Sequence, residues 1–331
     1  MNRMSKESPL LALRNLSISF GHHASPVHVV AGIDLVIEEA QTFGLVGESG
    51  CGKSLTALSI MGILPHHAMA RGEVLFKGNN LLTLDKESMR RLRGKELSMI
   101  FQEPMTSLNP VLTIGYQVAE VLMTHEGMKK DEAMEKTVEL LRAVKIPSPE
   151  IRVREYPHQM SGGMRQRVMI AMAIACNPSL LIADEPTTAL DVTIQAQILD
   201  LLRSLREQRN MAILLITHDI GVIAENADVA AIMYAGRIVE LSTVMNLLAK
   251  PKHPYTMGLL DSLPKRKGIP LKPIPGSVPR PDKFPHGCKF SDRCTHVTSS
   301  CKTEEPVLRA ISDGHFVRCI RSEEIEWASS I

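Results

Sequence analysis

Short apolar runs alternate with segments of helical spacing along the chain, and this pattern predicts a parallel α/β sheet. Runs typical of strands occur at residues 27–37, in "TFGLVG" (residues 42–47), in "SLLIADE" and in "MAILLITHD". A helix is predicted over residues 54–64, after a glycine-rich turn. The sequence "VAAIMYAGRIVEL" predicts a hairpin that turns at Ala235 and Gly236.

Two regions depart from this alternation. Between about Met105 and Met160 the apolar residues take helical spacing, as in "EAMEKTVELLRAVKI", which predicts a helical region. After Lys250, prolines crowd the stretch from Pro251 to Pro285, which predicts a semi-rigid, extended connector. The chain is therefore expected to contain an α/β core, a helical region and a C-terminal part beyond the connector.

The composition restricts the classes of function. The chain has 331 residues, of which 44% are apolar, so it can bury a sizeable core. A net charge of +2 and an aromatic content of 4% argue against nucleic-acid binding. The first residues contain too short an apolar run for a secretory signal, and the longest uncharged run, "VMIAMAIAC", falls short of the about 20 residues of a spanning helix. We therefore expect a cytosolic chain that does not itself cross a membrane.

The stretch "GESGCGKS" fits the phosphate-binding pattern G-x-x-x-x-G-K-[ST], with a predicted strand before it and a helix after it. Glycines let the backbone N–H groups face a phosphate chain, and the helix start adds the positive end of its dipole. Lys53 is expected to reach the outer phosphates and Ser54 to hold Mg²⁺. The alternative is a glycine-rich turn without a ligand. The expected nucleotide-binding residues are Gly47, Glu48, Ser49, Gly50, Cys51, Gly52, Lys53, Ser54 and Leu55.

A second motif, "LLIADEP", carries two acidic residues at the end of a predicted strand. Open α/β sheets place their ligands at such strand ends. Asp184 is expected to anchor Mg²⁺, directly or through water. Glu185 is expected to activate a water molecule against the γ-phosphate. The alternative is a strand that ends in an acidic helix cap.

The stretch "MSGGMRQR" places a serine and two glycines before a helix, which leaves N–H groups and a hydroxyl available to an anion. It resembles the signature motif of the ATP-binding cassette (ABC) ATPases, usually written LSGGQ, with Met160 and Met164 in place of Leu and Gln. Further motifs of that family are also present. They are "FQEP" with Gln102, "TTALD" with Asp191, "ITHD" with His218 and "SISFG" with Phe20. For the stretch "MSGGMRQR" itself, the alternative is a capped helix that binds no ligand.

The resemblance implies that two cassettes pair head to tail, with each ATP between the Lys53 loop of one and the Ser161 helix start of the other. The implied catalytic residues are Glu185, His218 and Gln102. The implied Mg²⁺ contacts are Ser54, Gln102 and Asp184. The further implied nucleotide contacts are Phe20 on the adenine, Asp191 at the dimer seam, and Ser161, Gly162 and Gly163.

Longer stretches narrow the resemblance to one branch. "IFQEPMTSLNP", "YPHQMSGGM", "LLIADEPTTALDVTIQAQI" and "HPYT" are similar to the dipeptide and oligopeptide importer ATPases of bacteria. The resemblance implies an α/β P-loop NTPase fold, a RecA-like ABC cassette, with a helical subdomain and a small Cys-rich C-terminal extension. The implied domains are residues 8–104 (core with an N-terminal β-subdomain and the phosphate-binding loop), 105–165 (helical subdomain), 166–250 (second part of the core) and 251–331 (connector and four-cysteine domain).

Four of the six cysteines lie near the end of the chain, and their spacing is wider than that of most structural zinc sites. Clustered cysteines in a reducing cytosol bind metal or do redox chemistry more often than they form disulfides. The resemblance implies a [4Fe–4S] cluster; zinc, and free thiols or disulfides, are the alternatives. The implied ligands are Cys288, Cys294, Cys301 and Cys319. Cys176 is expected to be a small buried residue of an apolar helix, and three histidines to be exposed polar residues: His286, His296 and His315.

The resemblance implies the ATP-hydrolysing subunit of an ABC importer for dipeptides and oligopeptides, peripheral on the cytoplasmic face of the bacterial inner membrane. The partners that it implies are a second ABC ATPase subunit, two transmembrane permease subunits and an extracytoplasmic solute-binding protein, without nucleic acid. The alternatives are an importer ATPase for nickel or another small solute, a soluble cassette ATPase acting on DNA or ribosomes, and half of an exporter. A single cassette with a short helical insert and no spanning segment disfavours the last two.

Overall fold

The computed structural model describes residues 8–21, 26–102, 107–188, 190–263 and 273–327. The chain forms two compact units. Unit 1 comprises Met1–Ile37, Thr42–Leu82 and Leu215–Ile331, and unit 2 comprises Glu38–Gln41 and Thr83–Leu214. The domain boundary expected between residues 104 and 105 lies outside the described residues. No helix of the described ranges is both long and apolar enough to cross a membrane.

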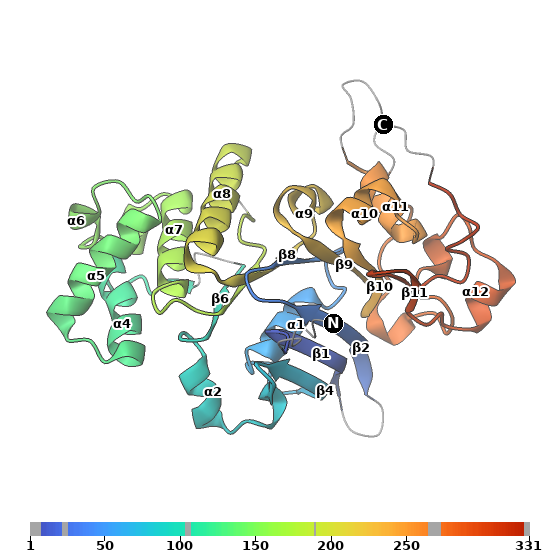
Figure 1. The fold of residues 1–331 in the computed structure, drawn as a ribbon, viewed down its shortest axis with the longest axis horizontal. Helices are drawn as coiled ribbons and strands as arrows, with labels where there is room; N and C mark the ends of the chain where they lie inside the picture. The colour runs from blue at the N-terminus through green and yellow to red at the C-terminus, as the bar shows by residue number, and fades with distance from the viewer. Residues whose placement is uncertain (1–7, 22–25, 103–106, 189, 264–272, 328–331) are drawn as a thin grey trace, which may run out of the picture. The chain divides into compact units, whose positions relative to one another are not determined.

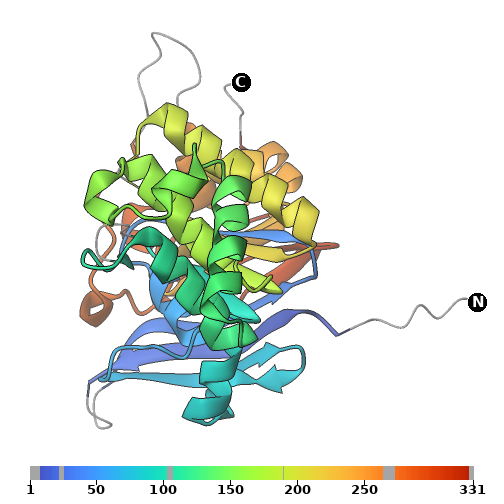
Figure 2. The ribbon, with the colours of Figure 1, turned by 90° about the vertical axis from the view of Figure 1, so that its left-hand side faces the viewer.

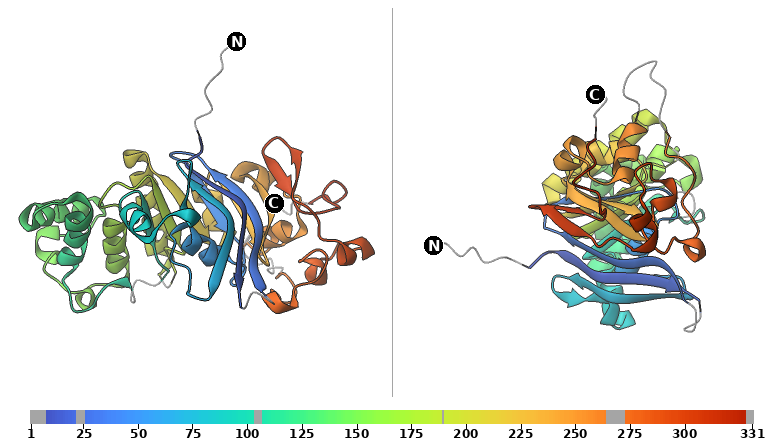
Figure 3. Two further views of the ribbon diagram at one scale, coloured as in Figure 1. Left: turned by 90° about the horizontal axis from the view of Figure 1, so that it is seen from below. Right: turned by 90° about the vertical axis from the view of Figure 1, so that its right-hand side faces the viewer.

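Unit 1 contains an antiparallel sheet near the start of the chain, drawn in blue in Figure 3. Its strand order is β2 (Val27–Ile37), β1 (Leu11–Phe20), β4 (Ala68–Phe76) and β5 (Asn79–Asn80). Side chains of β1 such as Leu11, Leu13 and Ile18 are buried, which gives the sheet one apolar face. The strand predicted over residues 27–37 is confirmed at both ends.

A second sheet crosses unit 1 further along the chain. Within unit 1 its strands follow the order β11 (Arg309–Ser312), β12 (His315–Val317), β10 (Arg237–Thr243), β9 (Val229–Tyr234) and β3 (Thr42–Val46). β3 and β9 run parallel, and β9 and β10 form the predicted hairpin. Its two turn residues have positive φ, 45° at Ala235 and 79° at Gly236, which matches the right-handed twist of hairpin strands.

The helices of unit 1 correct two expectations from the sequence. They are α1 (Lys53–Ile60), α9 (Ile220–Asn226), α10 (Val244–Ala249), α11 (Pro254–Asp261) and α12 (Ser299–Thr303), with 3₁₀ turns η1 (Leu81–Thr83, which reaches into unit 2), η3 (Pro281–Lys283) and η4 (Ser291–Arg293). α1 ends earlier than predicted because Gly62 takes a left-handed conformation, with φ 63°. The expected extended connector begins instead with a buried helix: Pro254 stands in its first turn, where proline loses no hydrogen bond.

Unit 2 combines buried strands with a group of helices. Its strands, in sheet order, are β8 (Ala212–Thr217, which leads into unit 1), β7 (Leu180–Asp184) and β6 (Leu97–Ile100). β6 and β7 pair in parallel and are buried throughout. Its helices are α2 (Lys86–Leu92), α4 (Ile114–Glu126), α5 (Lys130–Ala143), α6 (Pro149–Arg152), η2 (Pro157–Gln159), α7 (Gly162–Ala173) and α8 (Val192–Arg209). α4, α5 and α7 pack side by side (Figures 1 and 2). The helices α4, α5 and α6 confirm the helical region predicted between about Met105 and Met160.

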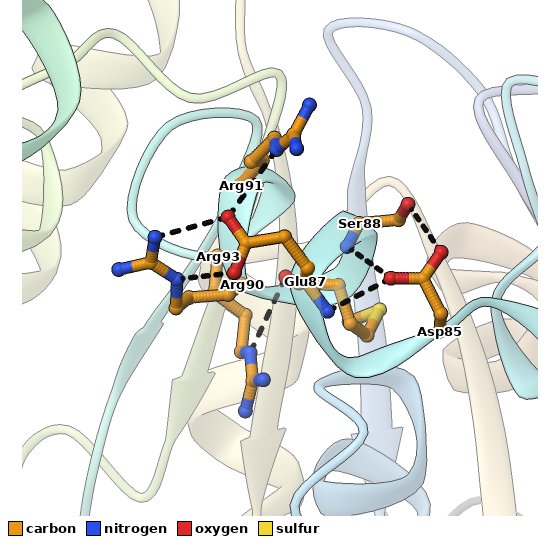
Figure 4. A network of polar contacts seen from close by, with 7 residues as sticks. Asp85, Glu87, Ser88, Arg90, Arg91 and Arg93 are labelled. Atoms are coloured by element: carbon orange, nitrogen blue, oxygen red, sulfur yellow. Dashed lines mark hydrogen bonds and ion pairs between the residues drawn. The ribbon is translucent and has the colours of Figure 1, made fainter.

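The short helix α2 is held by its own side chains (Figure 4). Asp85 caps its start by accepting hydrogen bonds from the backbone N–H groups of Glu87 and Ser88, each at 2.9 Å. The carboxylate of Glu87 pairs with Arg90 and Arg91 one turn later. This network is exposed and local, so it accounts for the helix and suggests no ligand.

A buried carboxylate ties the C-terminal hairpin of β11 and β12 to the rest of unit 1. Glu240 on β10 is fully buried. It accepts hydrogen bonds from the backbone N–H groups of Lys252 (2.8 Å) and His253 (2.9 Å), and its Oε1 lies 2.8 Å from Nε2 of His315. The expectation that His315 is exposed is therefore wrong, because its ring satisfies an acceptor that has no access to water. His286 and His296 are exposed as expected.

We expect His315→Ala to lower the free energy of unfolding by about 2–3 kcal/mol, because a buried carboxylate would lose one of its donors. Fluorescence of Trp327, the one tryptophan of the chain, follows unfolding in urea; its indole donates to Asp261 on α11 within unit 1. His286→Ala is the matched control and is expected to change stability by about 0.5 kcal/mol or less. Equal effects of the two variants would contradict the role of His315.

Candidate functional site

The loop from Gly47 to Gly52 joins a buried strand to a buried helix start. β3 is buried at every position, and α1 begins at Lys53. A Cβ on Gly47 would lie 2.0 Å from the carbonyl oxygen of Met233 on the neighbouring strand β9, so only glycine fits. Gly50 and Gly52 have φ of 82° and 106°, which glycine adopts without strain. The loop therefore has the curled backbone that phosphate binding needs, as predicted.

The side chain of Lys53 is folded back into this loop. Its ammonium donates to the carbonyl oxygens of Gly47 (2.7 Å) and Glu48 (3.2 Å), and the residue is only 4% exposed. Ser49 and Gly50 at the tip are exposed, whereas Ser54 and Leu55 are half-buried. Cys51 is buried as a small spacer, and burial raises the pKa of its thiol. A buried ammonium within a ring of backbone groups is well placed to meet an anion.

Glu48 is held by two further residues, neither of which the sequence indicated as part of the site. The backbone N–H of Glu48 donates to the phenol oxygen of Tyr255 on α11 at 2.9 Å. Its carboxylate pairs with Arg293 of η4 at 2.9 Å. Tyr255 lies in the quoted stretch "HPYT", but nothing in its spacing indicates a contact with a loop 207 residues away.

The acidic residues after β7 belong to unit 2. Asp184 ends the strand and is 4% exposed. Glu185 follows with φ 47°, a left-handed conformation that is unusual outside glycine. One carboxylate oxygen, Oε2, accepts from Nε2 of Gln102 and from the hydroxyl of Thr188, both at 2.9 Å. The structure thus brings together Gln102 and Glu185, two of the residues predicted to take part in catalysis. Thr188 was not singled out from the sequence.

The serine-glycine motif forms an exposed helix start on unit 2. Ser161 caps α7, and its hydroxyl accepts from the N–H of Met164 at 3.3 Å. Ser161 and Gly162 are exposed, while a Cβ on Gly163 would lie 2.8 Å from Ile194 on α8. The first glycine therefore leaves the helix end open, and the second allows close packing. This arrangement has the shape expected of an anion-binding helix start.

The remaining predicted site residues lie at the ends of secondary structure elements. Asp191 caps α8, and its carboxylate accepts from the N–H of Ile194 at 3.0 Å. His218 follows β8 in unit 1 and is exposed. Phe20 is the last residue of β1 and is half-buried. Within the motif "TTALD", Ala189 lies outside the described residues, as do Glu103 and Pro104 of "FQEP".

The four C-terminal cysteines line a single cavity in unit 1. Other residues that line it include Phe290, His296 and Arg321. Burial raises the pKa of the Cys288 and Cys319 thiols to about 11, and it also raises the pKa of the Cys294 thiol. Within the described ranges, no group of three or more histidine, cysteine, aspartate or glutamate side chains has the arrangement that could hold a metal ion. The four sulfur atoms therefore share a cavity but do not converge as ligands of one ion.

Cys176 departs from its expected place. It lies in the turn after α7, which ends at Ala173, and it is half-buried. Burial raises the pKa of its thiol to about 11. It lies in unit 2 and does not line the cavity of the other four cysteines.

The buried strand, the glycine loop and the helix that begins at Lys53 define the class of protein: a P-loop nucleoside triphosphatase with the mixed α/β fold of an ATP-binding cassette. The dimeric ATP-binding cassette MJ0796, solved with ADP and phosphate, supports this at a TM-score of 0.63 and 26% identity. The alignment covers 71% of this chain and 98% of that one.

Sequence comparisons narrow the class. The family "ABC transporter" matches residues 30–188, and the family "Oligopeptide/dipeptide transporter, C-terminal region" matches residues 239–301. The oligopeptide transport ATP-binding protein AppD of Bacillus subtilis is 50% identical over 96% of this chain and 98% of its own length. The dipeptide transport ATP-binding protein DppD of the same organism is 46% identical over 94% of each chain. The chain belongs to this family of ABC transporter ATP-binding proteins.

We expect Gly47→Ala to destabilise unit 1 by about 3 kcal/mol, because the added methyl group would meet the backbone of β9. Gly50→Ala is the matched control: among the described residues nothing lies within 4 Å of a Cβ there. That variant should lose only the about 1–2 kcal/mol of a left-handed residue. Urea unfolding followed by Trp327 fluorescence compares the two, and an equal or smaller loss in Gly47→Ala would contradict the close approach of the two backbones.

Proposed function

We propose that the chain is the ATP-hydrolysing subunit of an importer that powers peptide uptake. The observation that carries this proposal is the carboxylate of Glu185, which follows Asp184 at the end of a buried strand and is held by Gln102. Two supporting findings are identities of about half over nearly the whole chain with oligopeptide and dipeptide transport ATP-binding proteins. ATP and Mg²⁺ are the cofactors that this class of enzyme implies.

Each site residue has a task that its position supports. The loop from Gly47 to Gly52 offers N–H groups to the phosphates, and Lys53 exchanges its bonds to loop carbonyls for bonds to phosphate oxygens. Glu185 accepts the proton of the attacking water, while Gln102 and Thr188 orient its carboxylate. The ion that we assign to Ser54, Asp184 and Gln102 would neutralise charge on the outer phosphates.

The exposed serine-glycine helix start suggests that a second cassette completes the site. Ser161, Gly162 and Gly163 would bind the nucleotide held by the loop of a partner cassette, and Asp191 would lie at the seam between them. His218 would contact the γ-phosphate and Phe20 the adenine. ATP would then hold two cassettes together, and hydrolysis would release them.

The family also supports a place for the chain in a larger assembly. We propose two permease subunits in the membrane and an extracytoplasmic solute-binding protein as partners, with this chain on the cytoplasmic face of the inner membrane. In this assembly residues 8–104 and 166–250 would be the nucleotide-binding core. Residues 105–165 would be the helical subdomain facing the permeases, and residues 251–331 a C-terminal extension.

We further propose that the C-terminal extension holds a [4Fe–4S] cluster. The supporting observation is the cavity that Cys288, Cys294, Cys301 and Cys319 line together. The four thiolates would hold the cluster, which takes four cysteine ligands. A cluster would cross-link the extension by four bonds, and binding would release the protons of the buried thiols.

We expect Glu185→Gln to slow steady-state ATP hydrolysis by about 100-fold or more while nucleotide binding persists, because the variant lacks a general base. The control is Glu207→Gln, which makes the same change at an exposed carboxylate on α8 of the same unit. This variant should hydrolyse ATP at the wild-type rate. The assay uses the transporter complex purified from membranes with its partners. Unchanged hydrolysis in Glu185→Gln would remove Glu185 from this role, and a solute-binding partner that carries no peptide would contradict the proposed cargo.

We expect anaerobically purified protein to be brown, with broad visible absorbance and about four iron atoms per chain. Replacing Cys288, Cys294, Cys301 or Cys319 by serine should abolish the colour, whereas Cys176→Ser, which changes a thiol outside the cavity, should keep it. Iron content by elemental analysis and absorbance spectra provide the measurement. Colourless protein with about one zinc ion per chain would favour the zinc site instead, and metal-free protein would leave four thiols.

A further inference from the structure

Glu48 of the phosphate-binding loop is held at three separate points within unit 1. Its N–H donates to Tyr255 at 2.9 Å, and its carbonyl oxygen accepts from the ammonium of Lys53 at 3.2 Å. Its carboxylate Oε1 accepts from Nη1 of Arg293 at 2.9 Å. The position of this one residue therefore affects both the backbone of the loop and the resting place of its lysine.

The partner of that carboxylate is itself fixed in place. The side chain of Arg293 is 6% exposed, and its Nε donates to the carbonyl oxygen of Pro275 at 2.7 Å. Its guanidinium lies 5.6 Å from the ring centre of Tyr234 and 5.9 Å from that of Phe290. Burial disfavours the charged guanidinium, but hydrogen bonds to Glu48 and Tyr234 outweigh this effect, so the pKa of Arg293 is raised. Arg293 is thus a permanent, rigidly held cation.

A carboxylate in a phosphate-binding loop has an unfavourable effect that Arg293 can remove. A loop that receives the phosphates of ATP works by presenting positive partial charge, and a nearby anion repels those phosphates. Glu48 is also half-buried, so solvent screens its charge only in part. Simple docking of the C-terminal segment would not need an anion at this position, because a buried ion pair is often no more stable than an apolar contact.

We propose that Arg293 is a positioning residue for nucleotide binding. Its guanidinium neutralises the carboxylate of Glu48 and holds it against the C-terminal extension (residues 251–331), so that the loop can receive phosphates. This inference rests on the proposed ATPase function. It implies that the C-terminal extension contributes to nucleotide affinity. Arg293 precedes Cys294 and lies beside Phe290, and both of those residues line the cysteine cavity. A change in that cavity could therefore alter the position of Arg293 and, through it, of Glu48.

The test is a charge-rescue experiment on the purified transporter complex. Arg293→Met should weaken binding of a fluorescent ATP analogue by about tenfold and raise the KM for ATP similarly, a size typical of coupling between sites. The kcat at saturating ATP should stay within about twofold of wild type, because Glu185 and Gln102 are unchanged. Adding Glu48→Gln to Arg293→Met should restore most of the lost affinity, because the unpaired negative charge is then gone.

Two controls separate electrostatics from loss of structure. Glu305→Gln disrupts another ion pair of unit 1, in which Arg237 Nη2 lies 2.7 Å from Glu305 and which does not include the phosphate-binding loop. It should lower stability, read from Trp327 fluorescence, without changing nucleotide affinity. Lys53→Ala should lose nucleotide binding whatever residue occupies position 293. If Arg293→Met fails to fold, Arg293→Lys takes its place and should bind the ATP analogue within about threefold of wild type, since it keeps the charge. A folded Arg293→Lys variant that loses about tenfold would overturn the inference.

The outcomes distinguish this inference from the function beneath it. Unchanged affinity in a folded Arg293→Met variant overturns the inference. So does an affinity loss that Glu48→Gln leaves uncorrected, because the loss would then come from packing alone. An equal loss of nucleotide affinity in Glu305→Gln also overturns the inference, because that ion pair does not include the phosphate-binding loop. If the wild-type complex binds no ATP, or binds it as well after Lys53→Ala, the proposed function fails first.

Discussion

The nucleotide site depends on the close approach of two backbones, at Gly47 on one strand end and Met233 on its parallel neighbour. β3 and β9 pair in register, and the loop leaves β3 at the point where a Cβ would strike the carbonyl of Met233. A parallel pair of this kind is buried on both faces, so the chain cannot move aside to admit a side chain. The loop, the start of α1 and Lys53 come directly after this contact in the chain.

The resting position of Lys53 shows how the site can exist before its ligand arrives. A buried ammonium without partners would be strongly disfavoured, and the carbonyl oxygens of Gly47 and Glu48 supply those partners. Phosphate oxygens can replace these carbonyls as acceptors, so the ammonium would keep its partners when a ligand binds. On unit 2 the carboxylate of Glu185 likewise has hydrogen-bond partners without a ligand, because Gln102 and Thr188 donate to it. The ammonium of Lys53 and the carboxylate of Glu185 are therefore each oriented before any ligand binds, which lowers the cost of ordering them on binding.

The sequence predicted the features that local patterns determine. The hairpin at Ala235 and Gly236, the strand over residues 27–37 and the loop before Lys53 each depend on the preferences of a few neighbouring residues. The same reasoning failed where tertiary packing decides. Prolines after Lys250 predict an extended chain, yet Pro254 begins a helix because α11 buries Tyr255 and its neighbours within unit 1. Packing of an apolar helix face outweighs local propensity there.

The contacts that the sequence did not reveal are polar pairs between distant positions. Glu48 and Arg293 are 245 residues apart, and Glu240 and His315 are 75 apart. In a single sequence each of these side chains is indistinguishable from a solvated one, because charge at an isolated position predicts exposure. The cysteines differ, since their clustering near the chain end was visible and only their common cavity required the fold. The pair of Glu48 and Arg293 needs that same fold for a further reason: a charge inside the protein is strongly disfavoured unless an opposite charge lies beside it.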